Sequence, residues 1–146
     1  MSDTSPALDW EQVAEALAGA GIAHLATASA AGRPHVAAVM PTVEGDVVWI
    51  ATNASSAKAR NLKENPGVAL MWQPTAEIYV WGDAHLVADR DEVRRVWEAG
   101  IFPFDLATNF GAVDNPNLVL IRVEPHSATV LCQGAEGLAR RRWRKP

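Results

Sequence analysis

The stretch from residue 47 to residue 70, VVWIATNASSAKARNLKENPGVAL, constrains the fold more than any other part of the sequence. It opens and closes with apolar runs, 47–51 and 68–72, which are separated by hydroxyl-bearing and then basic residues. Pro66 ends the intervening helical segment, because the residue before a proline is pushed out of the α region. The pattern predicts a buried strand, a turn, a short helix and a second buried strand.

The turn and the helix in this stretch carry groups that can hold a phosphate. Ser56 supplies a hydroxyl at the expected start of the helix, and Lys58 follows within the first turn. A helix N-terminus offers free N–H groups and partial positive charge, and the lysine adds a full cation. The alternative is that Ser56 is only an N-cap and Lys58 is only solvated. This is not a P-loop or a Rossmann fingerprint, because neither GxxxxGK(S/T) nor GxGxxG after a strand is present.

Length and composition predict a single domain with a real core. The chain has 146 residues, of which 49% are apolar and 21% are charged. The polar, acidic first residues do not resemble a signal peptide, and no apolar run is long enough to cross a bilayer, so we expect a cytoplasmic protein without membrane contact. Cys132 is the one cysteine and no HExxH pattern occurs, so neither a disulfide nor a metal site is expected.

The charge is distributed unevenly along the chain. The net charge is −4, yet five of the thirteen Lys and Arg residues lie within residues 140–145. The remaining chain is strongly acidic, which argues against nucleic acid as a partner. We therefore expect a folded domain over residues 1–133 and a basic tail over residues 134–146, interpreted as a solvated chain end rather than an anion contact.

The rest of the sequence alternates short apolar runs with turn residues, which indicates a meander of antiparallel strands. Helices are expected at 6–18, capped by Asp9 or Ser5, and at 91–99, capped by Asp89. Further strands are expected at 22–28, 35–40, 77–87, 117–123 and 127–131. Gly82 lies inside the longest of these, where it suggests a bulge or a tight bend. Such strands favour a small closed barrel.

Several motifs in this order resemble a known family. They are IAHLAT (22–27), GRPHV (32–36), WIAT (49–52), SAKARNL (56–62), NPGVAL (65–70), VWGDA (80–84) and VLIRVEP (119–125). Together they are similar to the pyridoxamine 5'-phosphate oxidase-like, FMN-binding split-barrel superfamily, especially its short branch of general stress protein 26-like and actinobacterial proteins. The resemblance implies a mainly β fold, a six- or seven-stranded antiparallel split barrel with a few short helices. It also implies a homodimer that holds FMN at the subunit interface.

The resemblance assigns cofactor-binding roles to specific residues. One strand and its end would lie beside the isoalloxazine ring and offer backbone groups to it: Val36, Ala37, Ala38, Val39, Met40 and Pro41. Ala51 and Thr52 would continue that wall, and the phosphate would be held by Ser56, Lys58 and Asn61. His35 is the histidine best placed to touch the ring.

The sequence departs from the family pattern at the basic residues expected near the phosphate. Relatives commonly have an arginine just before the phosphate lysine, where this chain has Ala57. A nearby strand cation is also replaced, by Val36 at one site and by Pro41 at another. Arg60 or Arg33 would have to substitute for them. The C-terminal Arg-x-His segment that holds substrate in true pyridoxamine phosphate oxidases is also missing, so oxidation of that substrate is not expected.

Three functions follow from the resemblance. The first is an FMN-dependent oxidoreductase acting on an unidentified small molecule. The second is a reductase of the same fold that uses the deazaflavin coenzyme F-420. The third is a non-catalytic flavin-binding stress protein.

The irregular segment 100–116 is apolar for a loop, because it carries Phe102, Phe104 and Phe110. A loop of this length in a small domain usually has a role. Two hypotheses are open: the loop covers the cofactor of the other subunit, or the phenylalanines plug the open end of the barrel.

Overall fold

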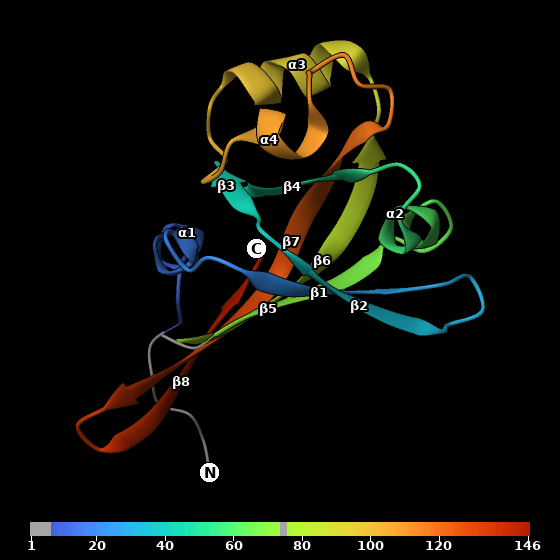
Figure 1. Cartoon of the computed structure of the whole chain (residues 1–146). Helices are drawn as coiled ribbons and strands as arrows, with labels where there is room; N and C mark the ends of the chain where they lie inside the picture. The colour runs from blue at the N-terminus through green and yellow to red at the C-terminus, as the bar shows by residue number, and fades with distance from the viewer. Residues whose placement is uncertain (1–6, 74–75) are drawn as a thin grey trace.

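The computed structural model describes residues 7–73 and 76–146, and its fold is mainly β (Figure 1). Within these residues, eight strands form one antiparallel sheet, accompanied by four short helices. In chain order the elements are α1 (Trp10–Leu17), β1 (Ala23–Ala28), β2 (Pro34–Val39), β3 (Thr42–Glu44), β4 (Val47–Asn53), α2 (Ala57–Leu62), β5 (Gly67–Trp72), β6 (Glu77–Val87), α3 (Arg90–Glu98), α4 (Leu106–Phe110), β7 (Leu118–Gly134) and β8 (Gly137–Arg144). The predicted fold class is confirmed.

The sheet curls into a barrel that stays open along one seam. Its strand order is β2-β1-β5-β6-β7-β4-β3, and β8 pairs with β7 outside that path. In the described part of the chain β2 and β3 therefore end the sheet without pairing to each other, although they are neighbours in sequence. Figure 1 shows the long strands β6 and β7 side by side, with α3 and α4 together at the β4 end and β8 extending at the opposite end.

The strand count exceeds the expected six or seven for two reasons. The short strand β3 pairs with β4, from Thr42 opposite Trp49 to Glu44 opposite Val47, and was not foreseen. The C-terminal segment adds β8. In contrast, the two strands expected at 117–123 and 127–131 are one continuous strand, β7.

β7 continues through Pro125 with a bulge opposite Gly82 of β6, because His126 is an extra residue between the partners of Trp81 and Gly82. The register between the two strands shifts between Trp81 and Gly82, as the sequence predicted for this glycine. A Cβ atom on Gly82 would overlap the Glu124 carbonyl oxygen and would lie 3.0 Å from Pro125 Cα. The close approach of the two backbones therefore requires glycine.

Gly82→Ala is expected to destabilise the fold by about 1–3 kcal/mol, the usual cost of overpacking, because the clash is with backbone and not with a mobile side chain. Gly67→Ala is the matched control, since the nearest atom to a Cβ there is Asn65 Oδ1 at 3.5 Å. Urea denaturation of both variants measures the difference. Equal midpoints for the two variants would contradict the close approach.

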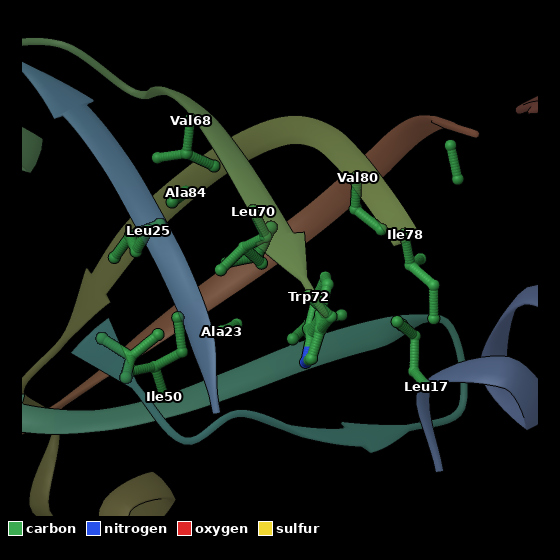
Figure 2. Close-up of a cluster of buried hydrophobic side chains, with 14 of the residues drawn as sticks. Leu17, Ala23, Leu25, Ile50, Val68, Leu70, Trp72, Ile78, Val80 and Ala84 are labelled. Carbon is green, nitrogen blue, oxygen red and sulfur yellow. The ribbon is translucent and has the colours of Figure 1, made fainter. Parts of the chain in front are cut away.

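Two hydrophobic clusters support the sheet. The larger fills the barrel interior, where Leu25, Leu70 and Val80 from three strands converge with Ile50 of β4 (Figure 2). The smaller lies between the sheet and α3, and its buried members are Val47, Trp49, Val93, Val96, Leu118 and Leu120.

Helix α1 closes one end of the barrel. Asp9 is its N-cap and forms a capping box with Gln12, whereas Ser5 lies outside the described residues. Val13 and Leu17 are buried against the barrel interior. Within the described residues, no helix has the length and apolar character needed to span a membrane.

The basic C-terminal segment is not a solvated end, so that expectation is wrong. Strand β8 pairs with β7 from Ser127 opposite Arg144 to Gly134 opposite Gly137. Trp143 is 9% exposed and joins the larger cluster, with its ring 5.0 Å from that of Trp10. The period of two in a strand places the tryptophan inward and Arg142 and Arg144 outward, a pattern that a count of charges cannot reveal.

Candidate functional site

The predicted strand, turn, helix and strand are present as β4, α2 and β5, and Ser56 is the N-cap of α2. The Ser56 hydroxyl accepts a hydrogen bond from the Ala59 N–H at 3.3 Å. It also lies 3.4 Å from the hydroxyl of Thr52, which is buried at the end of β4. The N–H groups of Ala57 and Lys58 have no acceptor within the helix, because they belong to its first turn. Hydroxyls and amides therefore gather at this turn.

Lys58 is a half-buried cation on α2. Burial lowers the pKa of its ammonium group below the usual lysine value. It forms no ion pair with any carboxylate among the described residues. Because a partly desolvated charge is unfavourable without a partner, an anion bound at this turn would relieve the cost.

Arg60 places a second cation at the same turn. Its guanidinium Nη1 donates a hydrogen bond of 2.7 Å to the carbonyl oxygen of Ser55, the residue before the N-cap. The side chain therefore folds back from the last turn of α2 toward the first. Arg33 is exposed in the turn between β1 and β2. Of the two candidate substitutes for the cation missing at Ala57, Arg60 is the one held at the helix start.

Asn61 has a structural partner of its own. Its side-chain amide donates to the Thr27 hydroxyl on β1 at 3.0 Å, and Thr27 is 3% exposed. This hydrogen bond attaches α2 to the barrel wall and occupies part of the amide that was expected to hold phosphate. Thr27 was missed, since nothing in its sequence surroundings separates it from an ordinary core threonine.

The predicted ring wall lies on an edge strand. The side chains of Val36 and Ala38 are exposed, that of Ala37 is half-buried, and that of Val39 points into the core. In the described chain, β2 pairs only with β1, so its other edge keeps free backbone groups. Ala51 is half-buried beside Thr52 at the end of β4.

His35 carries an unsatisfied polar atom on this strand. It lies opposite Thr27 in the register of β1 and β2. Its Nδ1 atom is buried and has no hydrogen-bond partner among the described residues. Buried polar atoms without partners are uncommon in native proteins, so this one is a candidate contact for a bound group.

Met40 and Pro41 follow β2 and line a pocket of about 380 Å³. Trp72 of β5 and the loop residues Ile101 and Pro103 border the same pocket. The loop is held there by the Thr42 hydroxyl, which donates to the Ile101 carbonyl oxygen at 2.7 Å. The end of the predicted ring wall and the start of the apolar loop are therefore neighbours.

The phenylalanines of that loop have a packing role. Phe102 and Phe110 lie against the smaller hydrophobic cluster, beneath α3. Phe104 contacts the Phe102 ring edge-on, with centroids 5.7 Å apart. Phe102 and Phe110 therefore pack between the sheet and α3 and not against the barrel interior, which differs from the plug hypothesis, and the cofactor cover stays a prediction.

Phe102→Ala is expected to lower the free energy of unfolding by about 2 kcal/mol, below the ~3–5 kcal/mol of a fully buried phenylalanine, because its ring is half-buried. Flavin affinity should stay nearly constant. Thermal melting and an FMN titration on the same preparation measure both effects. An unchanged melting temperature combined with weaker FMN binding would contradict the packing role.

Residues 9–132 match the family model for pyridoxamine 5'-phosphate oxidase. The chain belongs to this family. No curated protein matches it. The family match ends just before β8, so the strand with three outward arginines lies beyond the matched region.

Solved structures share the fold at low sequence identity. General stress protein 26 from Bacillus anthracis is 22% identical to this chain, with a TM-score of 0.65. The match covers 82% of this chain and 93% of the general stress protein. A pyridoxamine 5'-phosphate oxidase-related, FMN-binding protein from Nostoc punctiforme is 16% identical, with a TM-score of 0.74. The match covers 97% of this chain and 94% of the Nostoc protein. An F420 reductase is 24% identical, with a TM-score of 0.56. The match covers 74% of this chain and 88% of the reductase.

Proposed function

We propose that the chain is a flavin-binding oxidoreductase that holds FMN with its phosphate at the start of α2 and its ring along β2. The observation that carries the proposal is Lys58, a half-buried cation without an acidic partner in the described chain, next to the capping hydroxyl of Ser56. A phosphate near neutral pH carries close to two negative charges and accepts several hydrogen bonds.

The donors fit such a group. Ser56, the first-turn amides, Lys58 and Arg60 would hold the phosphate, and Arg60 would make up for the cation missing at Ala57. The free backbone edge of β2 would meet the polar edge of the ring, while the unpartnered Nδ1 of His35 lies on the other face of the strand from Val36 and Ala38. FMN, when bound, supplies the hydride or electron chemistry, while the protein binds and orients it.

The proposal includes a homodimer, because the outer face of the sheet is apolar where the ring would lie. Val36, Ala26, Ala69 and Trp81 are direct neighbours across four strands. Val36 is 63% exposed and Trp81 39%. A second copy is the occupant that would cover this face and complete the site beside Val36 and Ala38. A sedimentation mass of one subunit at micromolar concentration would contradict the dimer.

Two alternatives keep specific support. The first alternative is a deazaflavin as the cofactor. It is supported by the fold shared with an F420 reductase and by Arg60 and Lys63, which lie on one short basic segment. The fold shared with general stress protein 26 is compatible with a flavin-binding protein that does not turn over. Oxidation of pyridoxamine phosphate is not proposed, since the Arg-x-His segment is missing.

The proposal is tested by titrating the purified protein with FMN and with coenzyme F-420 and monitoring the absorbance spectrum. Saturable FMN binding with reduction by a nicotinamide donor supports the oxidoreductase. Binding of F-420 alone supports the deazaflavin reductase, and FMN that binds but is not reduced supports the non-catalytic protein. If neither ligand binds, the proposed site is wrong.

A further inference from the structure

The pocket of about 380 Å³ beyond the end of β2 has no role in holding the phosphate. Met40 and Pro41 form one side of it, and the other sides are the C-terminal end of α1, Trp72 of β5 and the loop at 101–103. Its volume is within the range of about 300–1,000 Å³ that is typical of small-molecule pockets. The residues assigned to the dimer face are not among its described lining residues: Val36, Ala26, Ala69 and Trp81.

The pocket and the phosphate-binding turn lie at opposite ends of β2. Asn61 attaches α2 to Thr27, and Thr27 is paired with His35 near the start of β2. Met40 lies five residues further along the chain, about 16–17 Å away at the usual rise of a strand. Figure 1 likewise shows α1, which borders the pocket, and α2 on opposite sides of the barrel. A flavin whose phosphate is held at α2 would therefore direct its ring toward the pocket.

The described residues that line the pocket carry no charge, and Thr42 and Trp72 are the ones among them with a side-chain O–H or N–H group. The Thr42 hydroxyl already donates to the Ile101 carbonyl oxygen at 2.7 Å. Pro41 and Pro103 have no backbone N–H to offer. An ionised ligand would lose hydration here without gaining a charged partner, which is unfavourable.

We infer that this pocket binds an uncharged, apolar small molecule, and that the substrate of the proposed oxidoreductase belongs to this class. The second part rests on the proposed function, because the pocket adjoins the ring only if the flavin lies along β2 with its phosphate at α2. Lys58 and Arg60 serve the phosphate end, so the described lining of the pocket offers no cation to a carboxylate or phosphate on the substrate.

N-phenyl-1-naphthylamine, an uncharged dye whose fluorescence rises in apolar surroundings, is the probe. Titration of the full chain without FMN should show saturable binding of the dye. Two competitors of similar shape then test the charge preference at pH 7: neutral 1-naphthol and anionic naphthalene-1-sulfonate. Naphthol should displace the dye at a concentration at least tenfold lower than the sulfonate does.

Pro103→Arg tests whether the dye occupies this pocket, because Pro103 is exposed and borders it. The added cation should narrow the preference for naphthol over the sulfonate about tenfold, the scale of one charged hydrogen bond. Leu138→Arg is the matched control, since Leu138 is 67% exposed on β8 and does not line the pocket. It should leave the preference unchanged.

Three outcomes would overturn the inference. The first is the absence of saturable dye binding, and the second is an equal preference in Pro103→Arg and Leu138→Arg. The third is displacement of the dye by FMN, which would make the pocket part of the ring position. If the dye binds with the expected preference but FMN does not bind, the proposed function fails and the ligand class of the pocket is supported.

Discussion

Trp143→Ala is expected to lower the free energy of unfolding by about 3–5 kcal/mol, the cost of removing a large buried aromatic side chain. The indole is 9% exposed, packs against the Trp10 ring at 5.0 Å and belongs to the larger hydrophobic cluster. It lies opposite Ala128 of β7, which is also buried. Its loss would therefore leave a cavity where β8, β7 and α1 meet.

Leu138→Ala is the matched control for this change. Leu138 is on the same strand but 67% exposed, so its truncation should shift the stability by no more than about 0.5 kcal/mol. Chemical denaturation followed by circular dichroism compares the two variants with the parent. If Trp143→Ala unfolds at the same midpoint as Leu138→Ala, the C-terminal segment does not contribute to the core.

Lys58→Ala is expected to weaken FMN binding by about 1.5–3 kcal/mol, the scale of one hydrogen bond to a charged group. This corresponds to an increase in Kd of roughly one to two orders of magnitude. The proposal requires it, because Lys58 is the half-buried cation beside the N-cap of α2. Ser56→Ala should cost less, roughly 0.5–1.5 kcal/mol of affinity, since its hydroxyl is neutral.

Lys63→Ala separates local binding from a general loss of positive charge. Lys63 is exposed at the other end of the same helix, as its C-cap, so Lys63→Ala should leave the affinity for FMN nearly unchanged. Titrations of all three variants with FMN and with coenzyme F-420 provide the comparison. Unchanged affinity for both ligands in Lys58→Ala would reject the phosphate site, and Ser56 would then act only as a helix cap.

The stretch 47–70 shows what a sequence pattern can predict. The two strands, the N-cap of the helix at Ser56 and the end of the helix before Pro66 follow from local preferences. Each of these features is present. An irregularity at Gly82 was also predictable, although the Glu124 carbonyl oxygen that excludes a side chain there comes from a distant segment.

The candidate site was predictable only in part. Ser56 and Lys58 lie where the resemblance placed them, at the start of one helix. The side chains of Val36 to Val39 divide between the solvent and the core, because alternate residues of a strand face opposite sides. Asn61 engages Thr27 across the fold, a contact that no spacing within the sequence indicates.

Although β3, α4 and β8 were not predicted, the sequence by itself determined most other local elements of this protein, including β4, α2, β5 and the start of α3 after Asp89. These depend on backbone sterics and on side chains a few residues apart. The tertiary structure decided that β7 continues through Pro125, that the basic C-terminal segment becomes β8, and that its arginines lie beside Tyr79 and Trp81. Those outcomes depend on strand pairing and on the burial of Trp143, and both join residues far apart in the chain.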